Sequence, residues 1–238
     1  MQPLLILLPG MMCDDRLFAP QVEHFSDSFD VRVADLTTAG TIEELAKIVV
    51  ASMAGRSAHV VGLSMGGIAA MELARQAPER VKSLALLNTT SAPDAPARRP
   101  IREAQMASAR AGRMMEMFAD EIMPHYLGQP ARETGKLDPV ILAMARDLGP
   151  DAFVRQSEAL LLRSAYADVV GAFEGPILAL SGAEDKVCVP ALHKEMAARA
   201  KHGRYVEIAA CGHLSTLEQP TDVNAALEQF LNDVTGGE

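Results

Sequence analysis

The chain has 238 residues and a formal net charge of −9, which argues against a nucleic acid or an anionic membrane as its partner. Its three cysteines, Cys13, Cys188 and Cys211, cannot all pair and lack metal-ligand spacing, so we expect a reducing cytoplasm and no metal site. The apolar run at residues 4–8 is too short to span a bilayer and follows no basic region, so no signal peptide or membrane anchor is expected.

Strand-like and helix-like segments alternate along the chain, which is typical of an α/β fold and predicts one domain over residues 1–238. Groups at the carboxyl ends of parallel strands meet at one edge of the sheet, so reactive side chains are expected there. The predicted strands cover residues 4–8, 31–36, 58–63, 83–88, 176–181 and 204–208, and the predicted helices cover 14–25, 41–54, 65–76, 190–200 and 221–233.

The loop after the first predicted strand begins with Pro9, Gly10 and Met11. Gly10 permits another backbone to approach closely, and Met11 offers its N–H group to whatever lies opposite. An ordinary strand-ending turn has the same composition. The loop therefore gains a function only from a reactive group beside it.

The third predicted strand ends in Gly62-Leu63-Ser64-Met65-Gly66-Gly67 and leads directly into a predicted helix. In a G-x-S-x-G turn the strand reverses sharply and holds the serine in a strained, left-handed backbone conformation. Gly62 and Gly66 leave room for so tight a turn. Ser64 is therefore a candidate nucleophile. The N–H of Met65, at the start of the helix, points to where a negative oxygen would form if Ser64 attacked a carbonyl.

Between residues 89 and 175 the pattern changes to helices without convincing strands. Because this segment follows the fourth predicted strand, we expect a helical lid that covers the Ser64 edge and excludes water. Arg155 and Arg163 within it are candidates for binding a substrate carboxylate, although surface ion pairs are the commoner role. Its methionines fit either an adaptable apolar pocket or ordinary helix packing: Met106, Met114, Met115, Met117, Met123 and Met144.

Two acids follow the fifth predicted strand, in a loop that ends at Pro190. Asp185 lies beyond the carboxyl end of that strand, where it can meet a group presented by a neighbouring strand. Glu184 is a weaker candidate for the same role. A solvated loop acid or a helix cap would give the same local sequence.

His213 follows the last predicted strand in the segment Cys211-Gly212-His213. The other five histidines are expected to be solvated or structural: His24, His59, His125, His193 and His202. The chain order of serine, acid and histidine is the one that a G-x-S-x-G turn requires, and it predicts a catalytic triad of Ser64, Asp185 and His213. His213 would take the serine proton, and Asp185 would fix the tautomer of the imidazole. The N–H groups of Met11 and Met65 would form the oxyanion hole.

These motifs resemble the α/β-hydrolase superfamily over nearly the full length of the chain. Residues 7–11 match its oxyanion loop, with proline where histidine is commoner, residues 62–67 match its nucleophile turn, and residues 212–220 match the segment around its catalytic histidine. The chain is most similar to small bacterial carboxylesterases and enol-lactonases with a helical lid. The family usually has a β-hairpin before the oxyanion-loop strand, and here that hairpin is missing. The resemblance therefore implies six parallel strands in the order 2-1-3-4-5-6, with helices on both faces.

The expected activity is hydrolysis of a small-molecule carboxylic ester or lactone through an acyl-enzyme on Ser64, with no cofactor. Two alternatives remain open. The same triad would serve a carbon–carbon bond hydrolase, and a ligand-binding or signalling protein could keep the triad but use closure of the lid in place of turnover. The sequence does not distinguish a monomer from a homodimer, nor does it identify the natural substrate.

Overall fold

The computed structural model describes residues 2–236, and a single six-stranded sheet forms its centre. The strands are β1 (Leu4–Leu8), β2 (Asp30–Val33), β3 (Ala58–Leu63), β4 (Val81–Leu87), β5 (Ile177–Gly182) and β6 (Gly203–Ile208). Their order is β2-β1-β3-β4-β5-β6, and every neighbouring pair is parallel. The predicted sheet, its strand order and its parallel orientation are therefore confirmed.

Helices cover both faces of this sheet. The helices outside the segment between β4 and β5 are α1 (Ala19–Phe25), α2 (Ile42–Ser52), α3 (Met65–Gln76), α9 (Pro190–Arg199), α10 (Ser215–Glu218) and α11 (Pro220–Thr235). Right-handed crossovers place α2, α3 and α9 on one face, and α1 on the other, where it contacts α11. Every residue of β1, β3 and β5 is buried as a result, which explains their continuous apolar sequences.

Two predicted boundaries are wrong for local reasons. The predicted helix at 14–25 is a short 3₁₀ helix, Asp15–Phe18, followed by α1. The side chain of Asp14 caps the first, and Pro20 lies in the first turn of the second, where its missing N–H costs nothing. Strand β2 ends at Val33 and not at residue 36, because the Asp35 carboxylate accepts a hydrogen bond from the Thr37 N–H at 2.9 Å and turns the chain.

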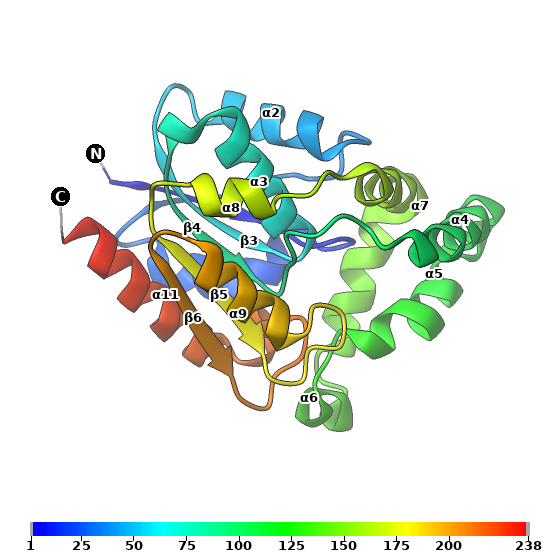
Figure 1. The fold of residues 1–238 in the computed structure, drawn as a ribbon. Helices are drawn as coiled ribbons and strands as arrows, with labels where there is room; N and C mark the ends of the chain where they lie inside the picture. Colours follow the sequence, from blue (N-terminus) through cyan, green and yellow to red (C-terminus); the bar gives the residue numbers. More distant parts are fainter. Residues whose placement is uncertain (1, 237–238) are drawn as a thin grey trace.

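Residues 88–176 between β4 and β5 contain helices and turns but none of the strands of the described chain. Figure 1 shows that most of these helices gather beyond the end of the sheet toward which the strands point, whereas α8 packs on α3. We call this segment, residues 88–176, the insertion, and α4 to α7 the insertion helices. The segment comprises α4 (Arg99–Ser108), α5 (Met114–Met117), α6 (Gln129–Thr134), α7 (Asp138–Leu162) and α8 (Ala167–Ala172).

The interior of the insertion is apolar. Met106, Met114, Met117 and Met144 are buried in the same core as the sheet, and Met115 and Met123 pack against it. Ordinary packing thus accounts for the methionine-rich composition. Within residues 2–236, no helix combines the length and the apolar character that crossing a membrane would require.

Candidate active site

The turn from β3 into α3 holds Ser64 in a backbone conformation that few side chains adopt, with φ 55° and ψ −116°. Glycine is required on both sides of it. A Cβ on Gly62 would lie 2.3 Å from the carbonyl oxygen of Gly66, and a Cβ on Gly66 would lie 1.8 Å from that of Leu8. The predicted sharp turn is present, and it places Ser64 at the amino end of α3.

Ser64, His213 and Asp185 meet at the carboxyl edge of the sheet. The Ser64 Oγ lies 2.9 Å from Nε2 of His213, and Nδ1 of the same ring lies 2.9 Å from Oδ2 of Asp185. The His213 side chain is 2% exposed and that of Asp185 is fully buried. The structure therefore brings together the three residues that the sequence predicted to act as a unit.

The Asp185 carboxylate is held by four donors of the protein. Its Oδ1 accepts hydrogen bonds from the backbone N–H groups of Val187 and Cys188, at 2.8 and 2.9 Å. Its Oδ2 faces His213 and also accepts a 2.9 Å bond from Nδ2 of Asn88. Burial alone would raise the pKa of Asp185, but His213 and these hydrogen bonds lower it below its usual value. Asp185 is therefore an anion with a fixed orientation.

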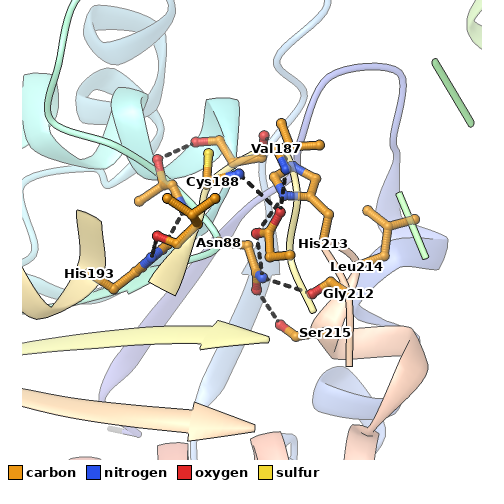
Figure 2. A network of polar contacts seen from close by, with 12 residues as sticks. Asn88, Val187, Cys188, His193, Gly212, His213, Leu214 and Ser215 are labelled. Atoms are coloured by element: carbon orange, nitrogen blue, oxygen red, sulfur yellow. Dashed lines mark hydrogen bonds and ion pairs between the residues drawn. The ribbon is translucent and has the colours of Figure 1, made fainter. Parts of the chain in front are cut away.

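Asn88 is a site residue that the sequence analysis missed. It follows β4, between the strands that present Ser64 and Asp185, and has φ 47°. Figure 2 shows its side chain donating to the carbonyl of Gly212 at 3.0 Å and accepting from the Ser215 hydroxyl at 2.6 Å. Asn88 thus connects the acid loop to the histidine loop. Its signal in the sequence is a polar residue directly after a buried strand in the middle of the sheet.

Glu184, the weaker candidate, and Asp94, which follows β4, make other contacts. Glu184 accepts a 2.6 Å hydrogen bond from the backbone N–H of Gln129, and it makes none with His213. Asp94, the acidic residue nearest in sequence to the end of β4, forms ion pairs with Arg102 and Arg163. The geometry therefore favours Asp185 over both.

The loop after β1 packs against Ser64. A Cβ added to Gly10 would lie 3.4 Å from the Cβ of Ser64, so glycine allows this loop to approach the nucleophile closely. The N–H groups of Met11 and Met65 donate no hydrogen bond within the described residues, while the next N–H, that of Met12, donates to Gln156 Oε1 at 2.9 Å. Two backbone donors are thus left free beside Ser64, as an oxyanion hole requires.

A sequence profile of the alpha/beta hydrolase family matches residues 5–226. The chain belongs to this family.

Named relatives of this hydrolase align along most of the chain. The acetyltransferase component of the acetoin cleaving system of Cupriavidus necator is 30% identical over 92% of this chain, which covers only 60% of that protein. The pimeloyl-[acyl-carrier protein] methyl ester esterase of Xanthomonas axonopodis pv. citri is 27% identical, over 98% of this chain and 96% of its own length. The enol-lactonase from Burkholderia xenovorans LB400 has a TM-score of 0.85 and 27% identity, over 98% of this chain and 92% of its own.

The histidine loop of the hydrolase is bound to the insertion through Tyr126. The backbone carbonyl of Tyr126 accepts hydrogen bonds from the N–H groups of His213 and Leu214, at 2.8 and 3.2 Å. The centre of its ring lies 5.6 Å from that of the His213 imidazole. The ring and the carbonyl together fix the position of His213. No periodic pattern marked Tyr126 in the sequence.

Glu218 strengthens the same junction. Its carboxylate accepts hydrogen bonds from the backbone N–H groups of Gly128, Gly212 and Leu214, at 2.7, 3.0 and 3.1 Å. Burial raises the pKa of Glu218, although these donors oppose the shift. Glu218 therefore joins the insertion to the two residues on either side of His213.

Of the other histidines in the hydrolase, His193 is buried beside the site. Its Nε2 accepts a 2.8 Å hydrogen bond from the Thr89 N–H, and the Thr89 hydroxyl donates to the Ser64 carbonyl at 2.7 Å. Burial lowers the pKa of His193 to about 4, so the ring is neutral near pH 7. His193 therefore has a structural role, as predicted for these histidines.

Two cavities among the described residues lie away from the triad. One of about 520 Å³ is lined mainly by apolar side chains of α3, β4 and α8, including Ala74, Val81 and Val169. The other, of about 300 Å³, lies beside Cys13 and Leu148. None of the triad residues lines either cavity, so neither is a candidate for the reaction site of the hydrolase.

Proposed function

We propose that this chain hydrolyses a carboxylic ester or lactone of a small molecule, with Ser64 as nucleophile, His213 as general base and Asp185 as the acid that orients it. The observation that carries the proposal is the continuous path from Ser64 Oγ through both nitrogens of His213 to Asp185, with 2.9 Å at each step. Two similar proteins, named as a methyl ester esterase and an enol-lactonase, support ester bonds as the target.

In the first half of the reaction, Ser64 Oγ attacks the ester carbonyl while Nε2 of His213 takes its proton. Asp185 accepts the Nδ1–H bond and stabilises the imidazolium that forms. The N–H groups of Met11 and Met65 would bind the negative oxygen of the tetrahedral intermediate. His213 then returns the proton to the leaving alcohol, and the acyl group stays on Ser64.

In the second half, a water molecule attacks the acyl-enzyme as His213 takes one of its protons. The tetrahedral intermediate uses the same two N–H groups. When it collapses, His213 protonates Ser64 Oγ and the carboxylic acid leaves. Ser64 and neutral His213 are thereby restored for the next turnover.

We further propose that residues 89–175 act as a lid within one hydrolase domain spanning residues 1–238. Two observations support this role. The insertion helices lie beyond the carboxyl edge of the sheet (Figure 1), and Tyr126 contacts His213 directly. A lid in this position would exclude water from the ion pair of His213 and Asp185 and strengthen it.

The test is a panel of p-nitrophenyl esters of short and long acids, together with simple lactones, assayed with the wild-type protein and Ser64→Ala. We expect hydrolysis by the wild type alone, and covalent labelling of Ser64 by a fluorophosphonate. A folded protein that hydrolyses none of these compounds and leaves Ser64 unlabelled would overturn the proposal, and would favour ligand binding without turnover. Release of product from a diketone but from no ester would favour carbon–carbon bond cleavage.

A further inference from the structure

Two arginines of the segment between β4 and β5 share one aspartate in the interior of the protein. Arg102 Nε lies 2.6 Å from one carboxylate oxygen of Asp94, and Arg163 Nη1 lies 3.1 Å from the other. The three side chains are 10%, 7% and 8% exposed, for Arg102, Arg163 and Asp94 respectively. The sequence analysis favoured a surface ion pair for Arg163, and the structure shows a buried one.

This cluster carries one positive charge more than it neutralises. A buried charge without a partner is costly, and an anionic ligand beside the cluster would reduce that cost. Burial lowers the pKa of Arg163, and Arg102 lowers it further, whereas Asp94 acts in the opposite direction. The two arginines of the cluster therefore repel each other, and Asp94 only partly offsets this repulsion.

The two arginines differ in their remaining donors. Arg163 has two of its three nitrogens paired with backbone carbonyls, because its Nε donates to the Ala92 carbonyl at 3.1 Å and its Nη1 to the Leu160 carbonyl at 3.3 Å. Arg102 uses Nε for Asp94, and its Nη1 has only a sulfur contact, at 4.0 Å from Sδ of Met11. Its Nη2 makes no hydrogen bond within the described residues. The outer edge of the Arg102 guanidinium therefore has donors to spare, in the fork geometry that suits a carboxylate.

The position of Arg102 relates this edge to the reaction site. Its sulfur partner Met11 also carries one of the two N–H groups proposed for the oxyanion hole, and the carbonyl of Met11 accepts a 3.3 Å hydrogen bond from the Tyr126 hydroxyl. The ring of Tyr126 lies against His213. The Met11 side chain therefore links the Arg102 guanidinium to the backbone N–H that would face a carbonyl attacked by Ser64.

We propose that Arg102 binds a carboxylate of the substrate, with Asp94 and Arg163 as positioning residues. The inference rests on the proposed ester hydrolysis and narrows it to esters or lactones that carry a second, ionised carboxyl group. The net charge of −9 repels such substrates at long range, but that repulsion is screened beyond about 8 Å at physiological ionic strength. Close to the site, the attraction of the substrate carboxylate to the positive charge of the cluster should exceed this screened repulsion.

The decisive experiment compares pairs of esters that differ only in the distal group: monomethyl adipate with methyl hexanoate, and monomethyl glutarate with methyl pentanoate. We expect the wild type to favour the charged ester of each pair in kcat/KM. Arg102→Gln should lower this preference about 10- to 100-fold, the value of a hydrogen bond to a charged group, because kcat/KM on the charged ester should fall more than that on the neutral ester. Asp94 keeps Arg163 as its partner in this variant, so the buried pair is neutral.

Three control variants separate recognition from charge and from folding. Arg102→Lys keeps the charge without the fork and should retain part of the preference. Arg163→Gln removes the same charge from a residue that has more of its donors paired with the protein, so its loss of preference should be smaller. Arg110→Gln removes an exposed arginine of the insertion, paired with Glu158, and should change nothing. Equal loss on charged and neutral esters in Arg102→Gln, or an effect of Arg110→Gln as large as that of Arg102→Gln, would overturn the inference.

A binding measurement keeps the inference testable if no ester is cleaved. The adipate dianion should stabilise the wild type against thermal unfolding in a saturable way, and Arg102→Gln should abolish that shift. Binding without turnover would overturn the proposed hydrolysis and keep the carboxylate site. Hydrolysis of neutral esters without a preference for charged ones, and without an adipate-dependent shift of the thermal midpoint, would overturn the carboxylate site and keep the proposed hydrolysis.

Discussion

The carboxyl edge of the sheet and the insertion helices that lie beyond it differ in how much space surrounds the glycines at their turns. At the edge, an added Cβ on Gly66 would meet the Leu8 carbonyl at 1.8 Å, and one on Gly67 would meet Thr89 Cγ2 at 2.6 Å. In the insertion, Gly112 and Gly149 have φ of 79° and 76°, and nothing lies within 4 Å of an added Cβ. The first region tolerates no change at its turn, whereas the second has room at its bends.

Backbone groups of the insertion form part of the contact between the two regions. The Tyr126 carbonyl accepts a hydrogen bond from the His213 N–H, and the N–H groups of Gly128 and Gln129 donate to the carboxylates of Glu218 and Glu184. Side chains of the insertion contribute as well, since Gln156 accepts a hydrogen bond from the Met12 N–H and the Tyr126 hydroxyl donates one to the Met11 carbonyl. Under the proposed function, the edge supplies the reacting groups and the insertion supplies Arg102, which would select the substrate. Mutations at the two regions should differ accordingly.

Loss of the nucleophile should have the largest effect. Ser64→Ala removes the attacking oxygen and leaves the turn intact, so kcat should fall by about 10⁴- to 10⁶-fold on any ester the wild type hydrolyses. Circular dichroism and the thermal midpoint should match those of the wild type. Substantial residual activity in a folded Ser64→Ala protein would mean that another residue attacks the ester.

The acid should come next. Asp185→Asn would favour the wrong tautomer of His213 and lower kcat by about 10³- to 10⁴-fold. Glu184→Gln is the matched control from the same loop, and it should cost little because Glu184 bonds Gln129 and not His213. The comparison fails if the two variants exchange these effects. If Asp94→Asn lost its activity even on neutral esters, the role of the acid would belong to Asp94 of the insertion.

The same contrast explains what the sequence could predict. Apolar runs identified the buried strands, and the resemblance to the α/β-hydrolase superfamily implied the strand order that the structure has. Ser64, Asp185 and His213 could be predicted to lie together because each lies on a segment that follows a strand of the parallel sheet. At the insertion no such rule applies, since its helices follow no regular topology. Tyr126 and Arg102 could not be found there, because their partners lie far away in the sequence.

Polar residues within the edge were also hard to find. Asn88 and Glu218 act by bonding backbone groups or the side chains of the triad loops, and a lone asparagine or glutamate has no spacing that predicts such partners. The early end of β2 has a similar cause, since it depends on one hydrogen bond of Asp35. Such local contacts are decided by tertiary packing and not by periodicity.

Low pH should reduce the free energy of unfolding because the unfolded chain takes up a proton on His193 more readily than the folded chain does. The folded chain binds a proton on this ring only near pH 4, whereas the unfolded chain binds it near pH 6.5. Stability is therefore complete above pH 6.5 and falls by about 3 kcal/mol as the pH drops to about 4. Urea unfolding across this window measures the slope. His193→Gln keeps an acceptor for Thr89 and should flatten it, and equal slopes in both proteins would contradict the assignment. Asp185, with its lowered pKa, loses its contribution only below this window.

Asn88 should matter more for kcat than for binding. Asn88→Ala removes a donor from the Asp185 carboxylate and another from the Gly212 carbonyl. A hydrogen bond to a charged group is worth about 1.5 to 3 kcal/mol, so kcat should fall by about 10- to 100-fold with little change in KM. Steady-state kinetics on a neutral ester decide this. A rise in KM at unchanged kcat would place Asn88 in substrate binding and not in the positioning of the acid.

The smallest effect is expected on the insertion side of the junction, at Tyr126. Tyr126→Phe keeps the ring against His213 and the carbonyl that accepts the His213 N–H, and it loses only the 3.3 Å bond to the Met11 carbonyl. A neutral hydrogen bond contributes about 1 kcal/mol, so kcat/KM on neutral esters should fall by about 5-fold or less. Tyr126→Ala removes the ring as well and should cost more. If Tyr126→Phe instead matched Asp185→Asn, the insertion would take part in the chemistry itself, and the division between an edge that reacts and an insertion that selects would not hold.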